Sequence, residues 1–321
     1  MTGHNQHIDR VLETATSSKA AAMSRLAASW SRSLTKHGLH PGKRRAPDRV
    51  TASDLRSRRE SLGEALALAS PGLDRLFEIV GKPGCAVLLT DAEGIVMDQR
   101  LNDVDEHTFK QWGFWQGTNW SEEAEGTNGV GTCLTEKRRV VIHRDEHFLA
   151  RNTGISCIDA PIFGPDGNLI GALGVSSARY DQSPALNAMI AALVSQTAQN
   201  IEVSKFRAAY PKSRIVMLPG ENLEAGALLA VDQDDLVVGA SRSARRRYLL
   251  GVGGDVEPCL ASDLLSDMKS ELGFEGAERR AVLQALTQTG NNVSEAARLL
   301  RVGRATLYRR MNKLKISTRK N

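Results

Sequence analysis

The last fifth of the chain, residues 278–316, constrains the possible fold more than any other stretch. Apolar residues recur there at helical spacing in three runs, and short polar breaks separate the runs. The pattern predicts three short helices, the first ending near residue 290, the second over 293–300 and the third over 304–314. The break before the third helix is three residues long, and Gly303 at its end is a candidate for an unusual backbone angle. The segment therefore predicts an all-α unit with a tight turn between its last two helices.

The third predicted helix has two distinct faces. Leu307, Met311 and Leu314 recur at helical spacing and are expected to face inward. The opposite face is cationic and rich in hydrogen-bonding groups, as a helix needs in order to read the major groove of DNA. Residues 276–321 hold eleven Lys and Arg against two Glu, a net charge of +9 that favours phosphate. The residues expected to contact DNA are Ser294, Arg304, Ala305, Thr306, Tyr308, Arg309, Arg310 and Lys313.

These residues resemble the Fis-type helix-turn-helix that closes many bacterial regulators. The resemblance rests on residues 292–300 and 305–310 together with Leu314. It implies sequence-specific binding to double-stranded DNA, by a homodimer that recognises a palindromic operator. Gly303 departs from the family, which usually has a serine capping the recognition helix, and glycine caps less well by only a few tenths of a kcal/mol. A basic, solvated helical unit without a nucleic-acid role is the alternative.

The overall composition is that of an ordinary soluble protein, with 41% hydrophobic and 25% charged residues in a chain of 321. That length allows two or three domains. No apolar run approaches a membrane span and residues 1–10 are polar, so we expect a cytoplasmic protein without a membrane partner. The four cysteines form no CxxC pair, which predicts neither a disulfide framework nor a zinc ribbon.

Charge is distributed unevenly along the chain. Residues 1–63 carry +7 and residues 276–321 carry +9, so with a total of +5 the interior carries −11. Basic ends around an acidic middle are typical of a protein whose ends meet nucleic acid while its middle has another task.

Upstream of the basic C-terminal unit, helical and sheet patterns alternate. Apolar residues at three- and four-residue spacing predict one amphipathic helix over 8–34, and Thr51 is placed to cap another that runs to Ile79. From Gly81 the pattern changes to strands, with a strong hairpin turn at 164–168. The expected strands are 85–90, 95–97, 139–143, 158–163 and 169–176, and a long helix over 184–206 closes the unit.

Residues 80–206 resemble a GAF domain, a small-molecule sensory module, of the subtype found in regulators of the acetoin-operon family. The resemblance implies a sensor with a central antiparallel sheet, no cofactor and an unidentified small-molecule effector. Its relatives usually carry an ATPase domain with a P-loop, GxxxxGK followed by Ser or Thr, and this sequence has no such motif. The motifs that carry the resemblance are 120–123, 126–132, 146–148, 157–162 and 167–171, with an upstream signature at 29–33 and 37–41.

The segment between sensor and C-terminal unit is less informative. A hairpin over 227–240 and a short helix near 244–250 look like the opening of a PAS domain, with Asp235 where glycine and Ser241 where asparagine usually stand. The fold class expected is therefore a multidomain α+β protein. Its parts are a helical N-terminal segment (1–79), a GAF-like sensor (80–206), a PAS-like connector (207–270) and an all-α three-helix DNA-binding domain (271–321).

The sensor offers candidate effector contacts. Trp112, Trp115 and Trp120 cluster in a chain with four tryptophans, and they are either core filler or the wall of an apolar pocket. We favour the wall, because pockets pair aromatic residues with a few polar groups such as Asn128. Cys133 and Cys157 are either buried hydrophobes or redox sensors, and burial is the simpler interpretation. The expected effector contacts are Trp112, Trp115, Trp120, Asn128, Cys133, His147, Phe148 and Cys157.

One pattern points to an enzyme instead. Residues 143–147 fit H-x-x-E-H, in which two histidines one helical turn apart bind zinc and a glutamate activates water. His143 ends a predicted strand and only His147 begins a helix, so the two histidines would not share a helical face. We therefore expect no catalytic residue, no metal site and no enzymatic activity.

The sequence as a whole predicts a ligand-responsive, one-component transcription regulator of a catabolic operon, with RNA polymerase as a further candidate partner. Effector binding would change the geometry of the dimer and thereby the fit of two recognition helices to a palindrome. The helix over 184–206 is the candidate dimer interface, since its apolar stripe is wider than a lone surface helix needs; covering the sheet is the alternative. A ligand-independent, nucleoid-architectural DNA-binding protein is the remaining alternative function.

Overall fold

The computed structural model describes residues 3–45, 47–81, 84–179, 183–218, 226–257, 259–265, 278, 281–286, 289, 292–314 and 316. The chain divides into two compact units, Met1–Ala230 with Gly239–Val256, and Val231–Val238 with Glu257–Asn321. None of the described helices is long and apolar enough to cross a membrane.

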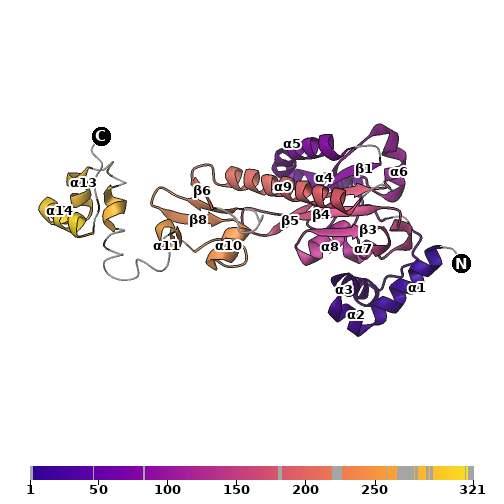
Figure 1. Ribbon diagram of the computed structural model, residues 1–321. Helices are drawn as coiled ribbons and strands as arrows, with labels where there is room; N and C mark the ends of the chain where they lie inside the picture. Colours follow the sequence, from indigo (N-terminus) through magenta and orange to yellow (C-terminus); the bar gives the residue numbers. More distant parts are fainter. Residues whose placement is uncertain are drawn as a thin grey trace. The chain divides into compact units, whose positions relative to one another are not determined.

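The helices and strands are labelled in chain order (Figure 1). They are α1 (Gly3–Thr16), α2 (Ser18–Met23), α3 (Arg25–Ser31), η1 (Arg32–Lys36), α4 (Ala52–Ser61), α5 (Gly63–Val80), β1 (Cys85–Asp91), β2 (Val96–Leu101), η2 (Asp103–Asp105), α6 (Glu106–Trp112), α7 (Glu122–Glu125), α8 (Gly129–Glu136), β3 (Val140–His143), η3 (Arg144–Glu146), η4 (Ala150–Asn152), β4 (Ser156–Phe163), β5 (Leu169–Ser177), α9 (Pro184–Ala209), β6 (Arg214–Leu218), β7 (Ala227–Val231), β8 (Leu236–Ala240), α10 (Arg242–Tyr248), β9 (Cys259–Leu260), α11 (Ala261–Leu265), α13 (Val293–Leu299) and α14 (Arg304–Lys313).

The sensor region is built on a five-stranded sheet with the order β2-β1-β5-β4-β3. The neighbouring strands run antiparallel, for example with Leu88 opposite Gly174 and with Ala160 opposite Leu173. The antiparallel sheet and its five strands were expected from the alternation of apolar residues, and the structure confirms them. The second strand extends further than expected, to Leu101.

Each face of this sheet carries its own apolar core, because successive side chains of a strand point to opposite faces. On one face Ile158, Ala160 and Ile162 of β4 pack with α5 and α9, which lie side by side in Figure 1. On the other face Cys157 packs with α6, α8 and the aromatic cluster around Trp120. The core of the first face includes residues of α5, so a helix assigned from the sequence to the N-terminal segment is part of the sensor core.

Most of the apolar stripe of helix α9 is buried within the molecule. Ile190, Val194, Ala198 and Ile201 are buried against α5 and the sheet, and Ile201 is only 3% exposed. Covering the sheet, the alternative left open by the sequence, accounts for these residues. Two apolar residues of α9 stay exposed, Leu186 (39%) and Met189 (64%).

The single helix expected over 8–34 is wrong, since the chain forms α1, α2 and α3 there and then one π-helical turn, η1. Two serines account for the breaks. The Ser17 hydroxyl accepts a hydrogen bond from the Ala20 amide (3.2 Å), and the Ser24 hydroxyl accepts one from the Ala27 amide (3.4 Å). Each serine thus caps a new helix instead of continuing the old one.

The next expected helix is divided as well. Thr51 caps it as expected, accepting from the Asp54 amide at 3.1 Å, but α4 and α5 are separated at Leu62. Gly63 follows that break, and glycine has the lowest helix propensity of all residues except proline.

The connector contains a four-stranded sheet of order β6-β7-β8-β9. The expected hairpin and helix are present as β7, β8 and α10, whereas β6 and β9 were not expected. Asp235 has a φ of +61°, a left-handed conformation that explains why glycine is usual there. The Ser241 hydroxyl accepts from the amides of Ala244 (3.4 Å) and Leu228 (3.0 Å). Whether the connector is a PAS domain stays a prediction.

Asp159 is a carboxyl group buried in the core beneath α8. Among the described residues its Oδ2 has no hydrogen-bond partner, and burial raises the pKa of Asp159 to about 8. Gly129 and Gly174 leave the room it needs, since a Cβ on either would lie 2.0 Å or 1.9 Å from a carboxylate oxygen. The folded protein therefore favours the protonated acid.

We expect Asp159→Asn to stabilise the protein increasingly as the pH rises. A folded-state pKa raised above the unfolded value contributes stability at low pH that is lost as pH rises through the folded pKa. The difference therefore develops between pH 3.8, the ordinary pKa of an aspartate, and about pH 8, the pKa of Asp159 in the folded protein. Over this range the free energy of unfolding of Asp159→Asn should rise, relative to the wild type, by up to about 1.4 kcal/mol per pH unit. Denaturant unfolding across this window measures it. Asp103→Asn, at an exposed carboxylate, is the control; a pH-independent difference at Asp159 would contradict the prediction.

Candidate functional site

The C-terminal helices pack around a small apolar core. Ala296 and Ala297 of α13 are almost fully buried against Leu307 and Met311 of α14, and their short side chains permit a close crossing. Residues 281–286 are helical too and contribute Val282, Ala285 and Leu286 to the same core. The inward face expected for α14 is confirmed. The expected end of the preceding helix, at residues 288 and 290, lies outside the described residues.

The turn between α13 and α14 is a helix C-cap of the Schellman type. The Val302 amide donates to the Ala297 carbonyl (2.9 Å) and the Arg301 amide to the Arg298 carbonyl (3.0 Å), while Arg301 has a φ of +52°. Gly303 instead has an extended backbone, φ −67° and ψ 144°. The expectation of an unusual angle at Gly303 was wrong, because the cap places the left-handed residue directly after the helix end.

Both helices begin at an identifiable cap position. The Asn292 side chain accepts from the amides of Ser294 (3.1 Å) and Glu295 (3.3 Å), a cap that the sequence analysis did not use. Gly303 occupies the cap position of α14 and provides no side-chain acceptor.

The predicted DNA contacts lie on the surface of this unit. Thr306 and Ser294 are half-buried, and the other six are exposed. The Arg304 guanidinium lies over the Tyr308 ring, 5.7 Å from its centroid. Arg310 pairs with Glu278 at 3.1 Å, so a phosphate contacted by Arg310 would compete with that carboxylate. The arrangement is a cationic helix face next to a short turn.

In the sensor region, the three clustered tryptophans do not share one environment. Trp120 is 1% exposed, stacks on Phe114 (4.7 Å between ring centroids), and donates from Nε1 to the Gly113 carbonyl (2.9 Å). Trp112 is half-buried beside that cluster, and Trp115 is half-buried under the Lys110 ammonium, 3.9 Å from the ring centroid. This placement supports the interpretation of Trp120 as core filler.

The other predicted effector contacts are divided between two cores. Cys133 and Cys157 belong to the Trp120 core, and burial raises the pKa of Cys157 to about 12, so its thiolate form is suppressed. Phe148 packs instead with Val11 and Trp30. Asn128 caps α8, accepting from the Gly131 amide (2.9 Å) and donating to the Gly126 carbonyl (2.8 Å).

The H-x-x-E-H residues do not form a zinc-peptidase site. His143 ends β3, as the sequence predicted, but His147 does not begin a helix: it follows η3 and has an extended backbone. The Glu146 carboxylate accepts from the His143 amide (2.6 Å), which occupies the group that would activate water. Burial lowers the pKa of His147 to about 4. Among the described residues no group of three His, Cys, Asp or Glu side chains is arranged to hold a metal ion.

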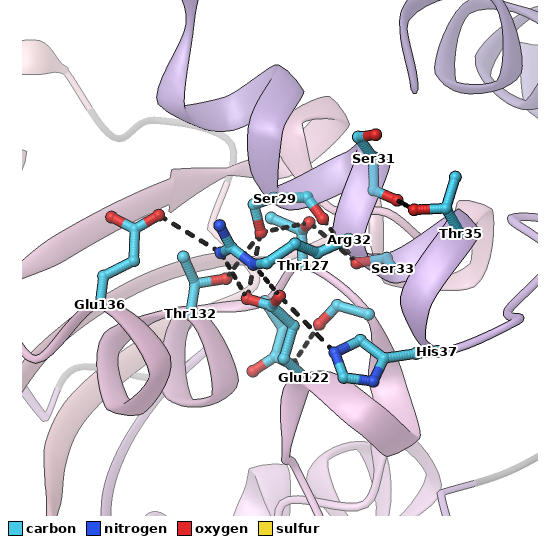
Figure 2. A network of polar contacts seen from close by, with 12 residues as sticks. Ser29, Ser31, Arg32, Ser33, Thr35, His37, Glu122, Thr127, Thr132 and Glu136 are labelled. Atoms are coloured by element: carbon cyan, nitrogen blue, oxygen red, sulfur yellow. Dashed lines mark hydrogen bonds and ion pairs between the residues drawn. The ribbon is translucent and has the colours of Figure 1, made fainter. Parts of the chain in front are cut away.

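A buried polar network joins the N-terminal signature to the glycine-rich motif, as Figure 2 shows. Glu122, 3% exposed, accepts from Arg32 Nε at 2.7 Å and from Arg32 Nη2 at 3.0 Å. The Ser29 hydroxyl donates to Glu122 Oε2 (3.2 Å) and lies 2.7 Å from the Thr127 hydroxyl. The two sequence signatures are therefore halves of one contact surface, which sequence reasoning did not foresee.

Comparison with known proteins assigns two parts of the chain. Residues 64–204 match the GAF domain, beginning within α5, and residues 274–314 match the Fis family of bacterial regulatory proteins. The chain is homologous to regulators of acetoin operons. Neither match covers residues 205–273. The GAF domain and the Fis-type helix-turn-helix expected from the sequence are confirmed.

Two regulators illustrate the homology. The chain is 29% identical over 230 residues to the acetoin catabolism regulatory protein of Cupriavidus necator, covering 70% of this chain and 34% of that protein. It is 28% identical to the acetoin dehydrogenase operon transcriptional activator AcoR of Bacillus subtilis, over 49% of this chain and 26% of that protein. The chain thus spans about a third or less of the length of these relatives.

One solved structure shares the fold over much of the chain. The E. coli DhaR(N)–DhaL complex matches with a TM-score of 0.51 at 16% identity, over 74% of this chain and 80% of that one. At this identity the likeness concerns the fold alone.

We expect Gly303→Ser to stabilise the start of α14 by a few tenths of a kcal/mol. The extended backbone suits a serine cap, and a Cβ there would meet only Thr306 Oγ1 at 3.6 Å, an ordinary contact. The new hydroxyl would accept from the Thr306 amide, whose hydrogen exchange should slow about twofold. Gly303→Ala adds the same Cβ without the acceptor and is the matched control. Equal protection in both variants would show that the cap is not the cause.

Proposed function

We propose that this protein is a sequence-specific DNA-binding transcription regulator whose activity responds to a small-molecule effector. The observation that carries the proposal is the exposed cationic face of α14, held by the buried core of a Fis-type helix-turn-helix. The GAF domain supports a sensory role for the larger unit. The relatives are named as regulators of catabolic operons, so we propose the same class of target here.

The mechanism that we propose follows from the size of the DNA-binding unit. One helix-turn-helix contacts only a half-site, so two units must be held about one turn of DNA apart by a dimer of the whole chain. Effector binding in the sensor would change that spacing. Residues 207–270 would then act as the connector, and the division of the chain at residues 79, 206 and 270 is part of the proposal.

The first residues of α14 are proposed to read base edges, while Arg310 and Lys313 position the helix on phosphates. A phosphate contacted by Arg310 would have to compete with the carboxylate of Glu278. Tyr308, stacked beneath Arg304, would orient that guanidinium toward the groove.

We expect Arg304→Ala to lose about 1–3 kcal/mol of binding on the preferred operator and much less on random DNA. Lys313→Ala should weaken all sequences alike and reduce the salt slope by about one. Fluorescence anisotropy against salt concentration, on an operator selected from a random pool, measures both. Equal losses on operator and random DNA from Arg304→Ala would contradict base reading and favour an architectural, sequence-indifferent protein.

We expect Met189→Glu to weaken a dimer built on the exposed part of α9, and with it operator binding. Met189 is 64% exposed and adjoins Leu186 on the helix surface, whereas a glutamate at Ile201 would unfold the core. Sedimentation of the full chain measures the change. Val104→Glu, at an 80% exposed residue of η2, is the control. An intact dimer in folded Met189→Glu would place the interface elsewhere, and a monomeric wild type that protects a palindrome would refute the dimer.

A further inference from the structure

A cavity of about 100 Å³ lies between α3, α8 and β3. Apolar walls come from Leu26 of α3 and from Val140 and Ile142 of β3. A polar side is formed by three hydroxyl groups, those of Ser29, Thr127 and Thr132. The cavity is therefore amphipathic, with a cluster of hydroxyls facing aliphatic side chains.

The three hydroxyls belong to buried side chains. Ser29 and Thr127 are fully buried and Thr132 is 3% exposed. Ser29 Oγ lies 2.7 Å from Thr127 Oγ1 and 3.5 Å from Thr132 Oγ1. A hydroxyl can rotate to donate or to accept, so this group can exchange partners with an incoming hydroxyl or carbonyl.

Four charged side chains line this cavity, Arg25, Glu136, Arg138 and Glu146. The Glu146 carboxylate accepts a hydrogen bond from the His143 amide (2.6 Å). Glu136 forms ion pairs with Arg138 and, at 3.4 Å, with Arg32. Arg25 also lines the cavity, but its side chain is exposed to solvent, where a charge contributes little to binding. Hydroxyls, aliphatic walls and a lining whose two arginines and two glutamates sum to no net charge suit a neutral ligand better than an ion.

We propose that this cavity is the effector site and that it takes a small neutral molecule with a hydroxyl or carbonyl group on an aliphatic chain. An engineered cavity of about 150 Å³ holds benzene, so about 100 Å³ suits a ligand of roughly four or five non-hydrogen atoms. This assignment rests on the proposed function, since it takes the sensor to bind a small-molecule effector and names the class and the site of that effector.

The position of the cavity explains how occupancy would reach the rest of the chain. Arg25, Leu26 and Ser29 lie outside the residues matched by the GAF domain, so the N-terminal helices complete a site that the domain alone lacks. Ser29 also donates to Glu122, which holds Arg32 of η1. A ligand that bonds to Ser29 therefore alters the contact between α3 and the sensor.

The test uses the full-length chain without DNA and the probes propan-2-ol, butanone and propane-1,2-diol. Titrations to about 10 mM should shift the methyl NMR signals of Leu26, Val140 and Ile142, since ligands of this size bind in the micromolar to millimolar range. Thr132→Val keeps the shape and removes one hydroxyl, so affinity should fall about three- to tenfold. Leu26→Phe, which fills the cavity from a half-buried position, should abolish the shifts.

Thr118→Val is the matched control, because Thr118 is also a fully buried threonine of the GAF domain and, within the described part of the chain, its hydroxyl has no partner. Its probe affinity should equal that of the wild type. Unchanged affinity for the probes in folded Thr132→Val and Leu26→Phe would overturn the assignment of this cavity as the effector site. Binding of acetate or ethylammonium in preference to the neutral probes, or no binding at all, overturns the ligand class.

These outcomes are separable from failure of the proposed function. Operator binding, measured on the same protein by anisotropy, depends on α14 and not on the cavity. Probe binding without sequence-specific DNA binding would refute the regulator and keep the site. Sequence-specific DNA binding without probe binding would refute the effector site and keep the regulator.

Discussion

One ion pair, between Arg32 and the buried carboxylate of Glu122, joins the N-terminal helices to the sensor. The carboxylate side chain is 2% exposed, and the two-pronged contact from Arg32 satisfies both of its oxygens. The hydrogen bond to Glu122 raises the pKa of Arg32, so the guanidinium stays charged. Removing one partner of such a pair typically costs 3–5 kcal/mol, because the remaining charge is left buried without compensation. The pair therefore fixes the N-terminal helices against α7 and α8.

Elements set by local pattern were predictable from the sequence, and elements set by competing hydrogen bonds were not. The five strands and α9 follow from periodicity. An apolar residue at every second position defines the buried face of a strand, and apolar residues three or four positions apart define the buried face of a helix. The N-terminal helix breaks do not, because Ser17 and Ser24 are tolerated within helices and cap new ones only where the tertiary path turns. The same limit applies to Arg301, whose left-handed backbone follows from the Schellman cap rather than from its residue type.

The candidate sites show a similar division. The DNA-facing residues of α14 could be found from sequence, because Leu307 and Met311 fix the inward face and the rest of the helix must point outward. The cavity could not, since Ser29 and Thr132 are 103 positions apart and only the fold brings their hydroxyls together. The tryptophan cluster is typical of a pocket wall because aromatic residues are common in pockets. Trp120 nevertheless fills core space, as large aromatic residues do in most domains. A cluster of tryptophans in the sequence therefore does not by itself locate a binding surface.

The energies limit how an effector of the proposed size can act. A coupling of 1–3 kcal/mol, which changes DNA affinity about 5- to 150-fold, is typical of allosteric sites. An effector need not break the Arg32–Glu122 pair to act within this range. Exchanging one or two hydroxyl hydrogen bonds, each worth about 0.5–1.5 kcal/mol net, falls within the range. Ser29 is the group through which such an exchange would act, because it bonds to Glu122 and also lines the cavity. The ion pair would then serve as the fixed pivot about which α3 adjusts, and a signal would leave the site as a small change in helix position.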